Sequence, residues 1–158
     1  MMPELPRLVA ITPPAAIVDN ASLVTNVVDT AGFRFVRINL LLGATDIALT
    51  NLRVQEADAI TNATTLTSGV DIADLVVGTA TTDAGGASAL PSATADNTFQ
   101  SFEIDMRGRR RYLKLIATVG DGAAGAFATA WAELHRAEKL PITAAEKGCA
   151  QVMKTPKL

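Results

Sequence analysis

The sequence has few of the residue types on which catalytic and metal sites are usually built. It contains one histidine, His135, and one cysteine, Cys149. A metal site needs several histidine, cysteine or carboxylate ligands around one ion, and a serine or cysteine nucleophile needs a paired base. We therefore expect no enzyme, no metal and no cofactor. A single cysteine also excludes an internal disulfide, which fits a reducing compartment.

Aromatic residues and long apolar runs are scarce as well. Aromatics make up 4% of the chain, so the core must consist of aliphatic side chains and a few phenylalanines. No stretch approaches the roughly 20 apolar residues of a membrane-spanning helix, and residues 1–6 lack the basic and apolar regions of a signal peptide. The formal net charge is −2, which does not favour nucleic-acid binding. The sequence predicts a subunit made in a cytosol, with neither a membrane nor a nucleic acid as partner.

Charge is distributed unevenly along the chain. Residues 40–106 carry one basic residue and nine acidic ones, whereas residues 107–158 carry ten basic and four acidic ones. This asymmetry suits head-to-tail contacts between identical subunits, or docking on an acidic shell. An ordinary solvated surface is the alternative interpretation.

The hydrophobic pattern predicts an all-β fold. Apolar side chains recur at every second position from Val36 to Leu42, at Leu52 and Val54 within the predicted strand 47–57, and in the segments 102–106, 113–119 and 126–133. A period of two is typical of strands that bury one face, and the length fits one domain. Seven or eight short strands separated by glycine turns favour an antiparallel β-sandwich, with jelly-roll connectivity.

Three local expectations accompany this fold. Residues 23–29 and 33–42 are expected to pair as a hairpin around Ala31-Gly32. The file of alanines at alternate positions from Ala126 to Ala132 predicts close approach of a second layer. The stretch 79–97 is poor in large apolar residues and is expected to be a long loop, either functional or a mobile spacer.

The domain organisation is predicted in three parts. Residues 1–14 hold four prolines and should form an extended N-terminal arm. Residues 15–140 should form the β-sandwich. Residues 141–158 should form a C-terminal arm or a short helix, since Thr143 and Glu146 have capping-box spacing.

Two patterns that could indicate chemistry have structural interpretations instead. Glu103 and Asp105 lie on one face of a predicted strand, at a spacing that some glycosidases use. Their alternation with Phe102 and Ile104 makes them the solvent face of that strand. The segment Gly120-Asp121-Gly122 links two predicted strands without the GxxxxGK[ST] pattern of phosphate loops, so it is expected to be a hairpin turn.

The run Arg107-Gly108-Arg109-Arg110-Arg111 is the most concentrated charge in the chain. Arginines can form bidentate pairs with carboxylates of a partner subunit. A solvated turn and a nucleic-acid patch are the alternatives, although only Tyr112 could stack on bases. The protein-interface candidates are therefore Arg107, Arg109, Arg110 and Arg111 in this turn, and Pro3, Leu5, Pro6 and Arg7 in the N-terminal arm.

The run FEIDMRGRRRYLKLIATVGDGAAGAFATAWAELHRAEKLP, residues 102–141, resembles the final strands of small head proteins of tailed bacteriophages. In those proteins an arginine-rich turn leads into a Tyr-x-Lys/Arg-Leu strand, followed by a glycine turn and an alanine-rich strand. The segment FRFVRINLLLGATD and the Ala/Thr-rich middle are similar in character. The resemblance implies a capsid cement or decoration protein, a jelly-roll-like subunit that oligomerises on the outer shell and clamps neighbouring capsomers.

The same resemblance implies partners and a location. The partners would be the major capsid protein and further copies of the chain, on the capsid exterior, after synthesis in the host bacterial cytoplasm. The arginine turn and the terminal arms would make the contacts. The alternative is a β-sandwich module of a phage fibre, spike or tail that binds a host glycan or another partner, with Trp131 or Tyr112 in a shallow groove.

Overall fold

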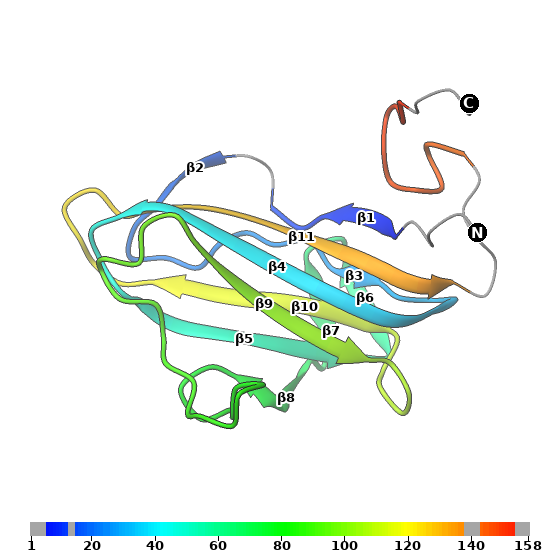
Figure 1. Ribbon diagram of the computed structural model, residues 1–158, viewed down its shortest axis with the longest axis horizontal. Coiled ribbons are helices and arrows are strands. Elements are labelled where there is room, and N and C mark those ends of the chain that lie inside the picture. Colours follow the sequence, from blue (N-terminus) through cyan, green and yellow to red (C-terminus); the bar gives the residue numbers. More distant parts are fainter. Residues whose placement is uncertain (1–5, 13–14, 138–142, 154–158) are drawn as a thin grey trace.

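The computed structural model describes residues 6–12, 15–137 and 143–153, and the regular structure in these ranges is entirely β (Figure 1). Two antiparallel sheets pack against each other, which confirms the predicted all-β sandwich. No described helix is long and apolar enough to cross a membrane. The strands are β1 (Arg7–Ala10), β2 (Ala15–Val18), β3 (Val28–Asp29), β4 (Phe33–Thr45), β5 (Leu49–Ala57), β6 (Ala59–Asn62), β7 (Thr65–Thr67), β8 (Val70–Val76), β9 (Thr98–Asp105), β10 (Tyr112–Val119) and β11 (Ala126–Ala137).

The first sheet, called sheet A, has the strand order β1-β11-β4-β9. Its centre is the long pair of β4 and β11, in which Leu40 lies opposite Ala130. β9 pairs with the other side of β4 and sets Phe102 opposite Ile38. β2 pairs with the beginning of β11 and so continues the β1 edge. β1 with β2 forms one edge of sheet A, and β9 forms the other.

The second sheet, called sheet B, has the strand order β3-β10-β5-β8. β10 and β5 form its centre, with Leu115 opposite Val54, and β8 pairs with the outer side of β5. β6 and β7 form a separate small hairpin. The Lys114 ammonium group of β10 donates a hydrogen bond to the Thr64 carbonyl oxygen between these two short strands.

The core lies between the two sheets and is almost wholly aliphatic. Alternate residues of β10 are buried from Leu113 to Val119, as the period of two predicts. The alanines of β11 from Ala126 to Ala132 are buried as well, so this file faces the second layer as expected. The largest fully buried side chains are Ile11, Ile38, Leu40, Leu42, Leu52, Ile72, Leu113, Leu115, Leu134, Val28, Val36 and Val54.

The predicted hairpin between residues 23–29 and 33–42 is wrong. β3 pairs with β10 in sheet B, whereas β4 lies in sheet A. The residues that precede β3 also run alongside β10, as shown by the hydrogen bond from the Leu23 amide to the Ala117 carbonyl oxygen. Thr30 donates two hydrogen bonds to the Arg111 carbonyl oxygen, at 3.1 Å from its amide and 2.6 Å from its hydroxyl. The turn at Ala31-Gly32 therefore carries the chain from one sheet to the other.

Of two less regular segments, one agrees with the sequence and the other agrees in part. Residues 77–97 form the predicted loop between β8 and β9, with an internal bridge between Thr81 and Ala87. Thr143 and Glu146 make reciprocal capping bonds, of 2.9 Å from the Thr143 amide and 3.2 Å from the Glu146 amide. These bonds close a turn and not a helix, because the following Gly148 takes a φ of +74° and ends it.

Candidate protein-interaction surfaces

The arginine-rich turn connects the end of β9 to the start of β10, and so joins the two sheets. Each of its arginines lies near a carboxylate of the same chain. Arg107 and Arg111 are half or more exposed, while Arg109 and Arg110 are about one third and two fifths exposed. The four pairs are Arg107–Asp105 at 2.5 Å, Arg109–Glu56 at 3.5 Å, Arg110–Asp58 at 3.6 Å and Arg111–Asp29 at 2.7 Å.

Two of these pairs lower the pKa of the carboxylate. Arg111 binds Asp29 through both Nε and a terminal nitrogen, at 2.8 and 2.7 Å, and these hydrogen bonds hold the pKa of Asp29 below its usual value. Arg111 also lies over the Tyr112 ring, 4.9 Å from its centre. Hydrogen bonds from Arg107 lower the pKa of Asp105 to about 2. The turn is thus fixed by its own ion pairs.

Three further arginines lie at the same end of the sandwich. Arg7 opens β1 opposite Leu134, near the end of β11. Arg34 lies at the start of β4, and Arg136 lies at the end of β11 with a positive φ of 53°. These strand ends lie beside the end of β9. Phe35 of β4 is paired with His135 of β11 on one side and with Asp105 of β9 on the other.

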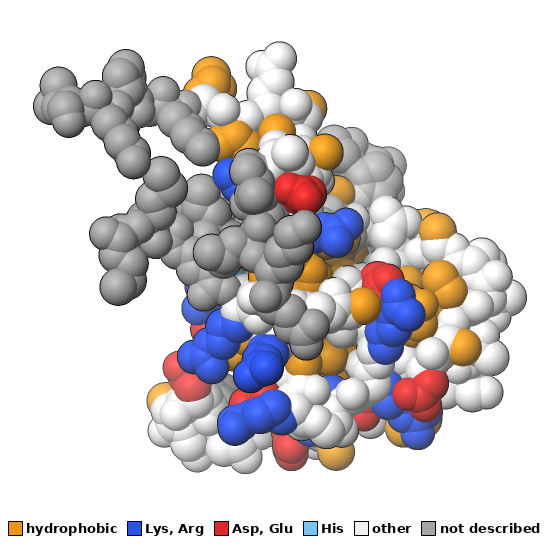
Figure 2. Space-filling model, turned by 90° about the vertical axis from the view of Figure 1, so that its right-hand side faces the viewer, with side chains coloured by type: hydrophobic (Ala, Val, Ile, Leu, Met, Phe, Trp, Pro, Cys, Tyr) orange, Lys and Arg blue, Asp and Glu red, His pale blue; other side chains and the backbone are white. Residues whose placement is uncertain are grey.

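We call this part of the molecule the basic end, defined by Arg7, Arg34, Arg107, Arg109, Arg110, Arg111 and Arg136. It holds seven of the nine arginines of the chain. Figure 2 views this end and shows Lys and Arg side chains gathered there beside a few acidic ones. The fold thus brings the arginine turn and Arg7, both predicted as interface candidates, to one surface.

The N-terminal candidates are only partly described. Pro3 and Leu5 lie outside the described residues. Pro6 is half-buried and immediately precedes β1, and Arg7 is exposed at its first position. The described part of the predicted arm is therefore an edge strand of sheet A, hydrogen-bonded to β11 from Arg7 to Ala10.

The outer face of sheet A carries most of the aromatic side chains. Phe35, Phe99, Phe127 and Trp131 alternate with the core residues of β4, β9 and β11. Phe99 is 62% exposed and meets Trp131 edge-on, with ring centres 6.1 Å apart. We call this surface the aromatic face. Sequence reasoning missed it, because the strands had to be ordered before their outward residues could be seen to converge.

Polar groups on the aromatic face are joined by hydrogen bonds. The Trp131 indole nitrogen and the Asn39 amide both donate to Glu133 Oε1, at 3.1 and 3.3 Å. The Ser101 hydroxyl donates to the Asn39 side-chain oxygen at 3.0 Å. Arg37 bonds Glu103 across the β4–β9 pair. These bonds fix the orientation of the side chains around the indole ring.

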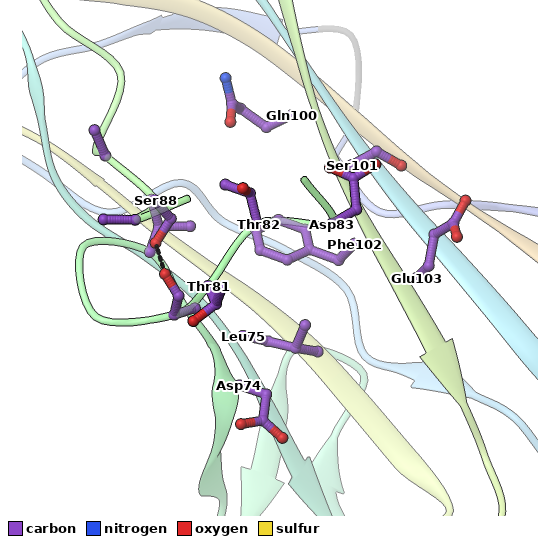
Figure 3. A pocket seen from close by; sticks show the side chains of 14 residues that line it. Asp74, Leu75, Thr81, Thr82, Asp83, Ser88, Gln100, Ser101, Phe102 and Glu103 are labelled. Carbon is purple, nitrogen blue, oxygen red and sulfur yellow. Dashed lines mark hydrogen bonds between the residues drawn. The ribbon is translucent and has the colours of Figure 1, made fainter. Parts of the chain in front are cut away.

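A groove of about 580 Å³ opens between β9 on one side and β8 with its following loop on the other (Figure 3). Its apolar lining includes Leu75, Val77 and Phe102. Its charged lining consists of Asp74, Asp83 and Glu103. The surplus of acidic residues between 40 and 106 signalled an acidic surface, but the groove itself depends on the facing of β8 and β9, which no local pattern revealed.

The remaining candidates occupy ordinary structural positions. His135 packs edge-on against Phe35, with ring centres 6.0 Å apart, and lies 3.5 Å from Glu133. Among the described residues, no three potential metal ligands of the His, Cys, Asp and Glu types cluster together. Glu103 and Asp105 are exposed, as predicted for a solvent face, and each is paired with an arginine. Cys149 is half-buried beside the Lys147 carbonyl oxygen.

No family model, curated protein or solved structure matches this chain. The basic end, the aromatic face and the groove are therefore interpreted from their own chemistry.

Proposed function

We propose that the chain is a structural virion protein, a cement or decoration protein that binds the outer shell of a tailed-phage capsid and stabilises contacts between capsomers. Its partners would be the major capsid protein and further copies of itself. The proposal rests on the resemblance of residues 102–141 to phage head proteins, on the strand order and on the basic end.

The strand order supports jelly-roll connectivity. If β1 and β2 count as one interrupted edge strand, and the β6–β7 hairpin as an insertion, eight strands remain. The first then pairs with the eighth, the second with the seventh, the third with the sixth and the fourth with the fifth. This is the order obtained when one long antiparallel hairpin is wound into two sheets, an architecture used by viral capsid domains.

The observation that carries the proposal is a set of unpaired cations at the basic end. Arg7, Arg34 and Arg136 are exposed and form no ion pair with the described residues. They come from three different strands of one sheet, so the sheet sets the positions of their backbones. Their free guanidinium groups can form bidentate bonds with carboxylates on an acidic shell.

The first experiment measures how many copies of the chain a purified particle holds, by quantitative mass spectrometry against the major shell protein. A ratio near one, or a simple fraction of it, is expected for a cement protein. A handful of copies would favour a fibre or tail module, and absence from particles would contradict both assignments.

The second experiment tests the basic end by cosedimentation with shells that lack the chain. Replacing Arg7, Arg34 and Arg136 by serine should weaken binding and reduce its dependence on salt. Replacing Arg109, Arg110 and Arg111 by serine should act in the same direction. Arg37→Ser is the matched control, because Arg37 lies on the aromatic face and pairs with Glu103. Unchanged binding by both triple variants would contradict the proposed contact.

The aromatic face favours one alternative, a module that binds a host glycan. An indole ring with an edge-on phenyl group and fixed amide, hydroxyl and carboxylate groups around it resembles the mixture of apolar and polar contacts by which small ligands are held. A glycan array compares the wild-type chain with Trp131→Ala. Binding that the substitution abolishes would support this alternative, and the absence of any bound glycan would remove it.

A further inference from the structure

The free edge of β9 is an unfilled strand position. β9 is the last strand of sheet A and pairs only with β4 among the described residues. Its other side borders the groove, which Gln100, Ser101, Phe102 and Glu103 line. Backbone groups on an open edge can accept an added extended segment, which gains main-chain hydrogen bonds from it.

The chemistry of the groove indicates which kind of segment would fit. Asp74 and Asp83 make no hydrogen bond or ion pair with the described residues, and Asp121 is the only other described acidic residue of which this is true. Both line the groove beside the apolar side chains of Leu75 and Phe102 (Figure 3). A matching segment would be extended, cationic and partly apolar.

The chain contains such a segment after its C-terminal turn. Residues 150–153 make no hydrogen bond with the described residues, and Met153 is 91% exposed. Residues 150–158, AQVMKTPKL, include Lys154 and Lys157 and no acidic residue. Pro156 and the absence of any helix pattern suit an extended backbone. The segment therefore has cationic side chains to match the carboxylates of the groove, and apolar side chains to pack on its apolar lining.

We propose that residues 150–158 of one copy bind in the groove of a second copy, as a strand added to the free edge of β9. The four β9 residues along the groove span about 13 Å at ~3.3 Å per residue, so four or five tail residues cover them. Met153 packs on the apolar lining, and the lysines lie near Asp74 and Asp83. The interaction needs only this chain, so it is independent of the capsid proposal.

The path of the chain favours a second copy over the same one. The turn before the tail is bound to β1, where the Leu8 amide donates to the Lys147 carbonyl oxygen at 2.9 Å. β1 and β9 are opposite edges of sheet A, and Figure 1 places residues 143–153 beyond β1. The turn lies one strand spacing outside β1 and an added strand would lie one spacing outside β9, so a tail crossing its own sheet covers five spacings, about 24 Å. Nine extended residues reach ~30 Å, so about two of them would remain to line β9, fewer than the four or five that are needed.

Binding of this kind joins unlike surfaces, a tail and a groove. Each copy has both, so copies associate head to tail and form rings or open chains according to the rotation between them. Sedimentation velocity over a range of concentrations should accordingly show a wild-type chain larger than a monomer. Deleting residues 150–158 should return it to a monomer at every concentration.

Charge variants test the groove directly. Asp74→Asn with Asp83→Asn should weaken self-association about tenfold, as expected for two exposed ion pairs, while Asp121→Asn is the matched control. Asp74→Lys with Asp83→Lys, and separately Lys154→Asp with Lys157→Asp, should each abolish association. Mixing these two double variants should restore it. Failure of the mixture to associate, or normal association of either variant alone, would overturn the proposal.

Cross-linking identifies the occupant of the groove. In a Cys149→Ser background, Met153→Cys on one chain should form a disulfide with Gln100→Cys on another, and Asp121→Cys should form none. A double variant that yields only internal cross-links would show that the tail binds its own chain, which overturns the proposal. If deleting residues 150–158 abolishes self-association but leaves shell binding intact, this proposal is supported, because the basic end and the groove are separate surfaces.

Discussion

Gly148 lies directly against the backbone of Leu8. A Cβ atom placed on Gly148 would come within 1.7 Å of the Leu8 carbonyl oxygen, and the glycine has a φ of +74°. The residue before it accepts the Leu8 amide hydrogen bond. The turn of residues 143–149 thus attaches to the open side of β1 only because residue 148 has no side chain.

Gly148→Ala should detach this turn from β1. The Leu8 amide would lose its partner and exchange with solvent at least about tenfold faster, a local loss of ~1.4 kcal/mol. Gly32→Ala is the matched control, since Gly32 has a φ of +81° but nothing within 4 Å of the added atom. Hydrogen exchange read by mass spectrometry separates the two, and an unchanged Leu8 amide in Gly148→Ala would argue against the contact.

Acid should weaken the fold through the carboxylates near the arginine turn. The pKa of Asp29 is lowered mainly by the hydrogen bonds of Arg111, and that of Asp105 to about 2 by those of Arg107. Because a lowered pKa favours the charged form in the folded state, this stability is complete above the ordinary value of 3.8 and is lost as pH falls through the folded values. Thermal melts between pH 6 and about 2 should show the decline.

The ion pair of Asp105 and Arg107 can be tested by a measurement on a single residue. In a carboxyl NMR titration, the pKa of Asp105 should be about 2 in the wild-type chain and higher in Arg107→Gln, because the side-chain hydrogen bonds that lower it most are gone. The backbone amide of residue 107 still donates to Asp105 in the variant, so part of the lowering should remain. Asp29 should keep its lowered pKa in this variant, since Arg111 is unchanged. A titration of Asp105 that does not respond to Arg107→Gln would contradict the assigned cause.

Leu115→Ala should be among the most destabilising single substitutions. Leu115 is fully buried at the centre of sheet B, and its carbonyl oxygen accepts the Thr25 hydroxyl at 2.6 Å. Removing its side chain should cost about 3 kcal/mol of unfolding free energy, through lost burial and the cavity left behind. Urea unfolding measures this, with Ile60→Ala as control. Ile60 is 41% exposed on β6 and should cost under about 1 kcal/mol.

Asp46 should hold the turn between β10 and β11. Its two carboxylate oxygens accept hydrogen bonds from the amides of Ala124 at 2.7 Å and Gly125 at 2.8 Å. Asp46→Ala should lower stability by about 1 to 2 kcal/mol, because bonds to a charged acceptor are stronger than neutral ones. Asp121→Ala, in the same turn, should have no such effect. Equal melting temperatures for the two variants would contradict this role.

Local patterns predicted those parts of the fold that depend on neighbouring residues. The alternation along 33–42 and 113–119 identified β4 and β10 and their buried faces, and the glycine segment 120–122 was correctly placed between two strands. An alternation of period two indicates only which side chains are buried. It does not indicate which strand pairs with which. For this reason the sequence predicts that residues 23–29 pair with residues 33–42, whereas in the structure β3 pairs with β10.

The sequence likewise predicted some features of the candidate surfaces, while others depend on the fold. The arginine run was visible as sequence, but its assembly with Arg34 and Arg136 depends on strand ends that are distant along the chain. Phe99 and Trp131 lie in separate strands and meet only because both flank β4. Composition indicated the acidic character of the middle segment, whereas the position of the groove followed from the facing of β8 and β9.

The pairing of β1 with β11 sets the order in which the molecule can be completed during synthesis. β11 is a central strand of sheet A, and β10 is a central strand of sheet B. Until residues 112–137 have left the ribosome, β4 and β5 each lack one neighbour, and β1 has no partner at all. A nascent chain therefore carries unpaired strands until β11 has emerged, and its folding is expected to be slow.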